Sequence, residues 1–176
     1  MVVNRRLTEI SDFLDESRAG VYAAIDGIGA ERLERVPEGG GWTAAQVVQH
    51  LALAESKTSQ YLAARLGKAI AGGLAHEQDE SSVLATAEGL ENPGSLTAPE
   101  VVTPAAVVAA GDAIAALRAS HDDVRSVLRS ADGWALADVQ TRHALFGPMN
   151  MYQSILLIGY HDRRHTPQIA RAVAAR

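Results

Sequence analysis

Two histidines near the C-terminus of this chain, His161 and His165, are four residues apart, and a third, His50, lies far upstream. Both segments are predicted to be helical. Side chains at positions i and i+4 lie on one helix face, so two imidazoles can bind one cation without distorting the backbone. Imidazole suits zinc, nickel, copper and iron, and three protein ligands leave coordination positions for water or substrate. The three histidines therefore predict an open divalent-metal site.

The residues around these histidines favour a metal site. The alternative is that one histidine of the pair lies on the solvated face and the other forms a hydrogen bond in the core. His161 and His165 share the apolar stripe of their helix, so the pair faces the interior, where an unpaired imidazole is costly. His50 falls on the apolar side of its own helix. Asp162 and Gln168 are close enough in sequence to orient the ring nitrogens by hydrogen bonds.

The other three histidines have weaker patterns. His121 lies on the apolar stripe of the third predicted helix, so it is either a fourth ligand or a hydrogen-bonded core or lid residue. His76 and His143 lie in predicted loops, where we expect solvent exposure or a local cap. Cysteine is absent, which excludes thiolate ligands and a cysteine nucleophile.

Apolar residues that recur every three or four positions predict four long helices, over residues 4–28, 44–70, 103–130 and 150–173. The last three begin at capping signals: Thr43 with Gln46, Thr103 with Pro104, and Asn150 with Gln153. Pro167 lies inside the fourth helix, where it removes one backbone amide. It predicts either a kink beneath His165 or a restarted final turn.

Two linking segments lack helical periodicity. The first, residues 71–102, is long, and its 72–102 part predicts a flexible or functional segment such as a lid. The second, residues 131–148, is predicted to be a loop. A long link lets the second and third helices run parallel, which makes the second and fourth antiparallel. In that arrangement the three histidines lie at similar positions along the bundle axis. We therefore expect an all-α four-helix bundle with a long crossover, folded as one domain over residues 1–176.

The composition excludes several functional classes. The net charge is −5, and no lysine or arginine occurs between Lys68 and Arg118. No basic stripe is present, so nucleic acid is not an expected partner. No apolar run is long enough to cross a membrane, and the lack of cysteine fits a cytoplasmic location. Neither a serine-elbow motif nor a glycine-rich phosphate loop is present.

Four segments resemble, in order along the chain, the DinB-like metal-binding superfamily: GWTAAQVVQHL at residues 41–51, Ala98-Pro99 with Pro104, HALFGPMNM at residues 143–151, and HDRRHTPQI at residues 161–169. The last segment is the most specific, and the resemblance covers essentially the whole chain. It implies a four-helix bundle in up-down-down-up order, commonly a homodimer. It also implies a divalent cation, often nickel or zinc, held by three histidines that match His50, His161 and His165.

Two functional hypotheses remain open, and the resemblance bears on the first. Some relatives are thiol-dependent transferases or isomerases that use mycothiol, bacillithiol or glutathione, and others are metal-dependent hydrolases. We therefore expect a metal-dependent enzyme that activates a small-molecule thiol or a water to attack a small-molecule substrate, with Glu55, Tyr61 and Asp162 as candidate proton handlers. The alternative is a non-catalytic dimeric binding or stress-response protein in which the metal is structural.

Overall fold

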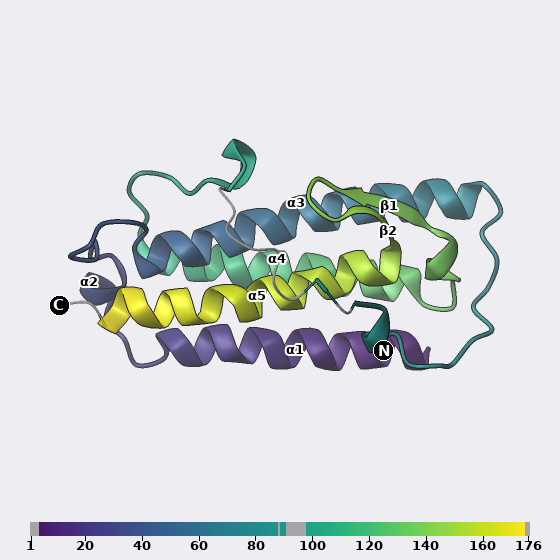
Figure 1. Ribbon diagram of the computed structural model, residues 1–176, viewed down its shortest axis with the longest axis horizontal. Helices are drawn as coiled ribbons and strands as arrows, with labels where there is room; N and C mark the ends of the chain where they lie inside the picture. The colour runs from purple at the N-terminus through teal and green to yellow at the C-terminus, as the bar shows by residue number, and fades with distance from the viewer. Residues whose placement is uncertain (1–3, 88, 91–97, 175–176) are drawn as a thin grey trace.

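The structure is a computed structural model that describes residues 4–87, 89–90 and 98–174. Four long helices lie side by side along its longest axis (Figure 1): α1 (Arg5–Ile25), α3 (Ala44–Ala71), α4 (Ala110–Ala131) and α5 (Met151–Ala174). The shorter elements are α2 (Ala30–Leu33) and three 3-10 turns, η1 (Leu84–Ala87), η2 (Glu100–Val102) and η3 (Leu136–Asp138). A hairpin of β1 (Gln140–His143) and β2 (Gly147–Asn150) precedes α5. The predicted all-α class is confirmed, with this small hairpin added.

Contacts along the helices give their relative directions. Arg6 lies over the ring of Tyr152, and Arg18, further along α1, binds Asp162, further along α5. The two helices therefore run parallel. Figure 1 shows α3 and α4 running the other way. Because α3 and α5 are antiparallel, a residue near the start of α3 lies beside the C-terminal half of α5. The histidines of the two helices are therefore brought to one level.

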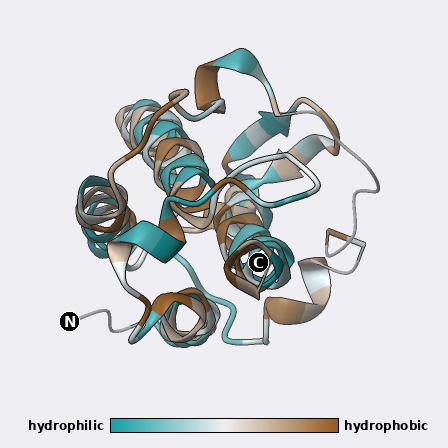
Figure 2. Cartoon of the chain, turned by 90° about the vertical axis from the view of Figure 1, so that its left-hand side faces the viewer, coloured by the Kyte–Doolittle hydropathy of each residue, from teal (hydrophilic) through white to brown (hydrophobic). Residues whose placement is uncertain are grey.

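The apolar core is divided into two clusters, one toward each end of the long helices. One cluster contains Leu7 and Ile155, and the other contains Leu51 and Ile169. Between them the helices bury polar side chains, including Arg18, which is 2% exposed. Figure 2 views the helices end on and shows that each carries both hydrophobic and hydrophilic residues. This pattern is typical of helices that pack on one face.

Two of the three predicted helix starts are confirmed. In α3, Gln46 donates its backbone amide to the Thr43 hydroxyl, and its side-chain oxygen accepts the Thr43 amide at 2.9 Å. Asn150 and Gln153 form the same reciprocal pair before α5. In both cases the two residues of the cap are three positions apart, so local interactions are sufficient to determine where the helix begins.

The predicted start at Thr103 is wrong, because α4 begins only at Ala110. Residues 103–109 instead form a non-helical strap across α3. The Gln46 side-chain amide donates to the carbonyls of Ala105 and Ala106, and the Ala105 amide donates to Gln49. These long-range bonds replace the helical bonds that the proline signal predicts.

The other differences are smaller. The first helix ends at Ile25 rather than residue 28, because the chain turns at Gly27, which has a φ of 68°. Residues 140–150 form the hairpin where a loop was predicted. Its strands have only four residues each, too few for a strand period to be detected. The hairpin is tied to α5 by a 2.6 Å hydrogen bond between Thr141 and Ser154.

Glu77 anchors the described part of the crossover to the long helices. It accepts hydrogen bonds from the Tyr152 hydroxyl at 2.6 Å and from Arg6 at 3.1 Å. Burial by itself raises the pKa of the Glu77 carboxyl, but these bonds and a backbone amide outweigh it, so the pKa lies below its ordinary value.

Glu77→Gln is expected to lower the free energy of unfolding by about 1–2 kcal/mol at pH 7, since it removes charged hydrogen bonds. The folded-state pKa is below the unfolded value, near 4.5, so the Glu77 contribution is present above that pH and is lost as the pH falls through and below it. Urea denaturation from pH 7 to pH 3 should therefore show the two proteins converging in acid. A constant difference across this range would contradict the assignment.

Gly159 permits the close packing of α5 on α1. A Cβ atom at this position would overlap the ring of Phe13 and lie 3.1 Å from the Ser17 hydroxyl oxygen. The Phe13 ring is 7% exposed and contacts the guanidinium of Arg163 at 4.4 Å and the ring of Tyr160, so relief of the overlap requires these contacts to shift.

Gly159→Ala is expected to destabilise the protein by about 1–3 kcal/mol, because overpacking exceeds the gain in helix propensity. The matched control is Gly67→Ala in α3, where an added Cβ meets nothing within 4 Å. The control should stabilise by about 0.5–1 kcal/mol. Thermal denaturation of both variants checks the pair, and equal shifts would contradict the packing argument.

Candidate metal centre

The structure brings His50 of α3 together with His161 and His165 of α5. One ring nitrogen from each lies within 4.8 Å of the others, and the Nε2 atoms of His50 and His161 are 3.2 Å apart. The three rings meet edge on, with centroids 4.5 to 5.0 Å apart. The indole of Trp42 packs against the His50 ring at 5.0 Å. Residues separated by more than a hundred positions thus form one cluster of imidazole nitrogens.

Two of the rings are oriented by hydrogen bonds on their far side. His50 Nδ1 lies 2.8 Å from the Val102 carbonyl, and His165 Nδ1 lies 2.7 Å from the Gln168 side-chain oxygen. Both partners accept only, so each Nδ1 donates and each Nε2 keeps its lone pair in the neutral ring. Facing lone pairs need a proton or a cation between them, and the cluster therefore fits a divalent cation. The predicted role of Gln168 is confirmed.

All three imidazoles are held in the neutral form that binds metal. Burial, followed by the charges of the neighbouring histidines and of Arg164, lowers the pKa of His161 well below its ordinary value. Burial also lowers the pKa of His165, to about 4, against the opposing effect of Gln168. The pKa of His50 is lowered for the same first reason.

Asp162 does not orient a histidine. Its carboxylate accepts from Arg18 at 2.7 Å, and Arg18 also lies 3.0 Å from Glu55 of α3. Burial raises the pKa of Asp162 to about 6, even though Arg18 opposes the shift. One buried guanidinium thus joins α1, α3 and α5 next to the histidine cluster.

Arg18, Glu55 and Asp162 form a buried polar layer, and His121 belongs to it. Its Nδ1 lies 3.4 Å from Glu55 and its Nε2 lies 3.1 Å from Asp15, so it is a hydrogen-bonded core residue rather than a fourth member of the cluster. The bond to Glu55 raises the pKa of His121 in spite of burial. For Glu55, burial raises the pKa, but His121, Arg18 and Ser120 outweigh it and the net shift is downward.

The histidine cluster opens into a cavity of about 1020 Å³. Its wall includes α3, α5, the tip of the hairpin, and Pro99 and Val102 at η2. Tyr61 lines it with 42% exposure, and the Tyr61 hydroxyl accepts the Arg142 amide. Of the segment predicted to be a lid, Leu90 also lines the cavity, whereas residues 88 and 91–97 lie outside the described residues.

His143 is a cavity residue that sequence reasoning missed. His143 caps its own turn, as predicted, since its Nδ1 accepts the Leu145 amide at 3.2 Å. The same residue also lines the cavity, and a neutral ring that accepts at Nδ1 carries its proton on Nε2. Burial lowers the pKa of His143, which favours this neutral form. Its position within the HALFGPMNM segment was the available signal. His76, by contrast, is exposed and stacks on Trp134 at 4.5 Å.

Pro167 does not end α5. The helix continues from Met151 to Ala174 with the proline inside it, so the predicted restart does not occur. The Thr166 hydroxyl donates to the Asp162 carbonyl at 2.9 Å in this turn. His165 therefore stays on the same continuous helix as His161.

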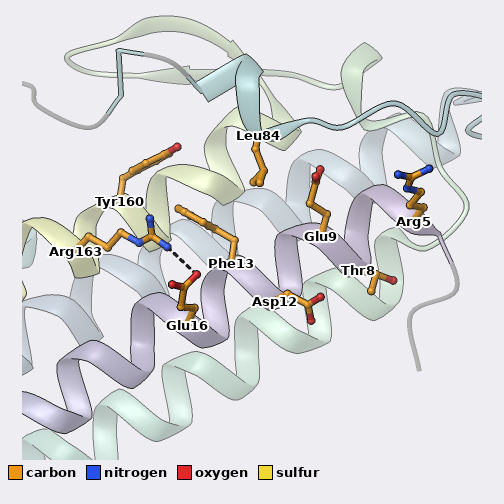
Figure 3. Close-up of a pocket in the computed structure, with 9 residues that line it drawn as sticks. All are labelled: Arg5, Thr8, Glu9, Asp12, Phe13, Glu16, Leu84, Tyr160 and Arg163. Atoms are coloured by element: carbon orange, nitrogen blue, oxygen red, sulfur yellow. Dashed lines mark hydrogen bonds and ion pairs between the residues drawn. The ribbon is translucent and has the colours of Figure 1, made fainter.

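A second hollow, of about 790 Å³, lies between α1, η1 and α5 (Figure 3). Of its polar lining residues, Arg163 binds Glu16 at 3.1 Å and also donates to the Ser17 hydroxyl at 2.9 Å. None of its lining residues is a histidine. The hollow therefore lacks the donor set of the larger cavity.

The fold and the cluster define a mostly helical protein with a candidate three-histidine metal centre. The family model of the DinB superfamily matches residues 14–169, and the chain belongs to this superfamily. No match was found among curated proteins or among solved structures. Within the described residues, no helix has the length and apolar character needed to span a membrane.

Proposed function

We propose that this protein is a metal-dependent enzyme in which His50, His161 and His165 hold a divalent cation, nickel or zinc. The observation that carries the proposal is the convergence of three neutral imidazoles within 4.8 Å at the wall of a large cavity. A structural ion alone would not need such a cavity. We further propose that the chain is one DinB-like domain whose long helices form an up-down-down-up bundle.

When bound, such a cation lowers the pKa of a thiol or water toward neutrality, which prepares it for attack on an electrophile. The chain has no cysteine, so a thiol nucleophile must come from a small-molecule cosubstrate. Tyr61 is the proton handler that we favour, because it lines the cavity and is 42% exposed. Glu55 and Asp162 are paired with Arg18, and we assign them to holding α3 and α5 in register.

The test is turnover by metal-loaded protein. Nickel- or zinc-loaded protein, mixed with glutathione, mycothiol or bacillithiol and 1-chloro-2,4-dinitrobenzene, is expected to form the thioether faster than protein stripped with a chelator. Ester substrates test the water alternative in the same way. Equal rates with and without metal would contradict the enzyme proposal. A metal-dependent rise in melting temperature without turnover would favour the non-catalytic alternative.

The homodimer and the cytoplasmic location are part of the same proposal. The dimer rests on the family resemblance, and the location rests on the absence of cysteine. Sedimentation analysis of metal-loaded protein at micromolar concentration is expected to give twice the mass of the 18.6 kDa chain. A monomer under these conditions would contradict the dimer.

A further inference from the structure

Four cationic side chains line the cavity beside the histidines, although the whole chain carries a net charge of −5. Lys57 lies on α3, Arg142 on β1, and Arg164 and Arg171 lie on α5. Three different elements thus place positive charge along one cavity. Clustering of this kind in an acidic protein calls for a functional explanation.

The acidic residues of the wall do not neutralise this charge. The described lining contains two carboxylates, Glu55 and Asp162, and both are buried and paired with Arg18. Lys57, Arg142 and Arg171 are exposed, and none of them forms an ion pair with any described residue. The accessible charge that a ligand meets at this wall is therefore positive.

Arg164 extends the positive field to the histidine cluster. It lines the same cavity and directly precedes His165 on α5, so its charge lies beside the cluster as well. A low-dielectric wall strengthens such a field compared with open solvent.

The remaining wall is largely apolar and aromatic. Trp42, Leu145, Phe146 and Leu157 line the same cavity. Leu145 is 54% exposed and adds accessible apolar surface to this wall. A ligand with only a charged group would leave this surface in contact with water.

We propose that the cavity binds a small organic oxyanion, a carboxylate or a phosphate, whose apolar body lies on the aromatic wall and whose charged end pairs with Lys57 and Arg142. These two residues lie on the same side of the histidines, because Tyr61 follows Lys57 by one helical turn and its hydroxyl accepts the Arg142 amide at 3.2 Å. This inference rests on the proposed function, since it names the substrate class of that site. Guanidinium groups match the planar or tetrahedral oxygens of both anions, whereas a neutral or cationic analogue lacks that pairing.

The test compares four probes of one shape: 4-phenylbutyrate, 4-phenylbutyl phosphate, 4-phenylbutanol and 4-phenylbutylamine. Calorimetric or NMR titration is done on metal-loaded and on metal-stripped protein. In both forms at least one anion is expected to bind about tenfold more tightly than the alcohol, and the amine least tightly. The tighter of the two anions identifies carboxylate or phosphate as the recognised group. Equal affinity of anion and alcohol would overturn the proposal.

The variant Lys57→Gln/Arg142→Gln is expected to lose about tenfold in affinity for the anion and little for the alcohol. The matched control removes two charges that do not line the cavity: Lys68→Gln/Arg129→Gln. Equal losses in both double variants would show a net-charge effect only and would overturn the proposal.

Metal-stripped protein separates this inference from the proposed function. If the protein binds no metal but still prefers the anions, the cationic wall is supported and the metal proposal fails. If the preference exists only with metal and survives the double substitution, the anion binds the cation alone and the inference fails.

Discussion

Replacing His161 with alanine is expected to abolish stoichiometric metal binding. His161 is the central member of the cluster, with its Nε2 3.2 Å from that of His50 and its ring 4.5 Å from that of His165. Loss of a hydrogen-bonding partner of a metal ligand typically costs about 10- to 100-fold in metal affinity, and loss of the ligand itself should cost more. Elemental analysis after nickel or zinc loading and dialysis is expected to fall from about one ion per chain to almost none.

His76→Ala is the matched control, because His76 is an exposed histidine that stacks on Trp134 away from the cluster. It should keep the full metal content. Circular dichroism should show the same helix content in both variants, so that unfolding is not mistaken for ligand loss. Unchanged stoichiometry in His161→Ala would refute the ligand assignment.

Replacing Arg18 with leucine is expected to give the largest loss of stability, about 3–5 kcal/mol. Arg18 is 2% exposed and pairs with Glu55, Asp162 and the Leu117 carbonyl. Its removal leaves Asp162 buried without a cation and leaves Glu55 with only His121 and Ser120 as partners, so part of the desolvation cost is no longer compensated. Urea denaturation measures the free energy of unfolding.

Arg129→Leu in α4 is the control, since Arg129 is exposed and its change should stay within about 0.5 kcal/mol. Arg18→Leu is also expected to weaken metal binding, because the lost pairs connect α3 and α5, which hold the histidines. A stability loss below about 1 kcal/mol would show that the buried pairs nearly cancel their own desolvation cost.

The histidine pair illustrates how far sequence reasoning reached. His161 and His165 are four residues apart on a helix, so their common face follows from helix geometry alone. His50 could be placed with them only through an assumed packing of two helices. The structure supplies that packing, together with the Val102 carbonyl that orients His50 from a segment more than fifty residues away.

The polar layer shows where sequence reasoning stopped. Asp162 is adjacent to a histidine in sequence, and for that reason it was assigned to orienting a ring. Adjacent helical residues point about 100° apart, and Asp162 therefore faces Arg18 of α1 rather than the cluster. His143 was placed in a loop because its four-residue strand is stabilised by pairing with Gly147 rather than by its own pattern.

By itself the amino-acid sequence determined the long helices, the caps at Thr43 and Asn150, and the shared face of His161 and His165. These features depend on interactions within a few residues, which local spacing encodes. Tertiary structure alone decided the start of α4 at Ala110, the pairing of Arg18, and the cationic wall of the cavity. Each of these depends on side chains that meet only after the helices pack, and the free energy of that packing outweighs local preference.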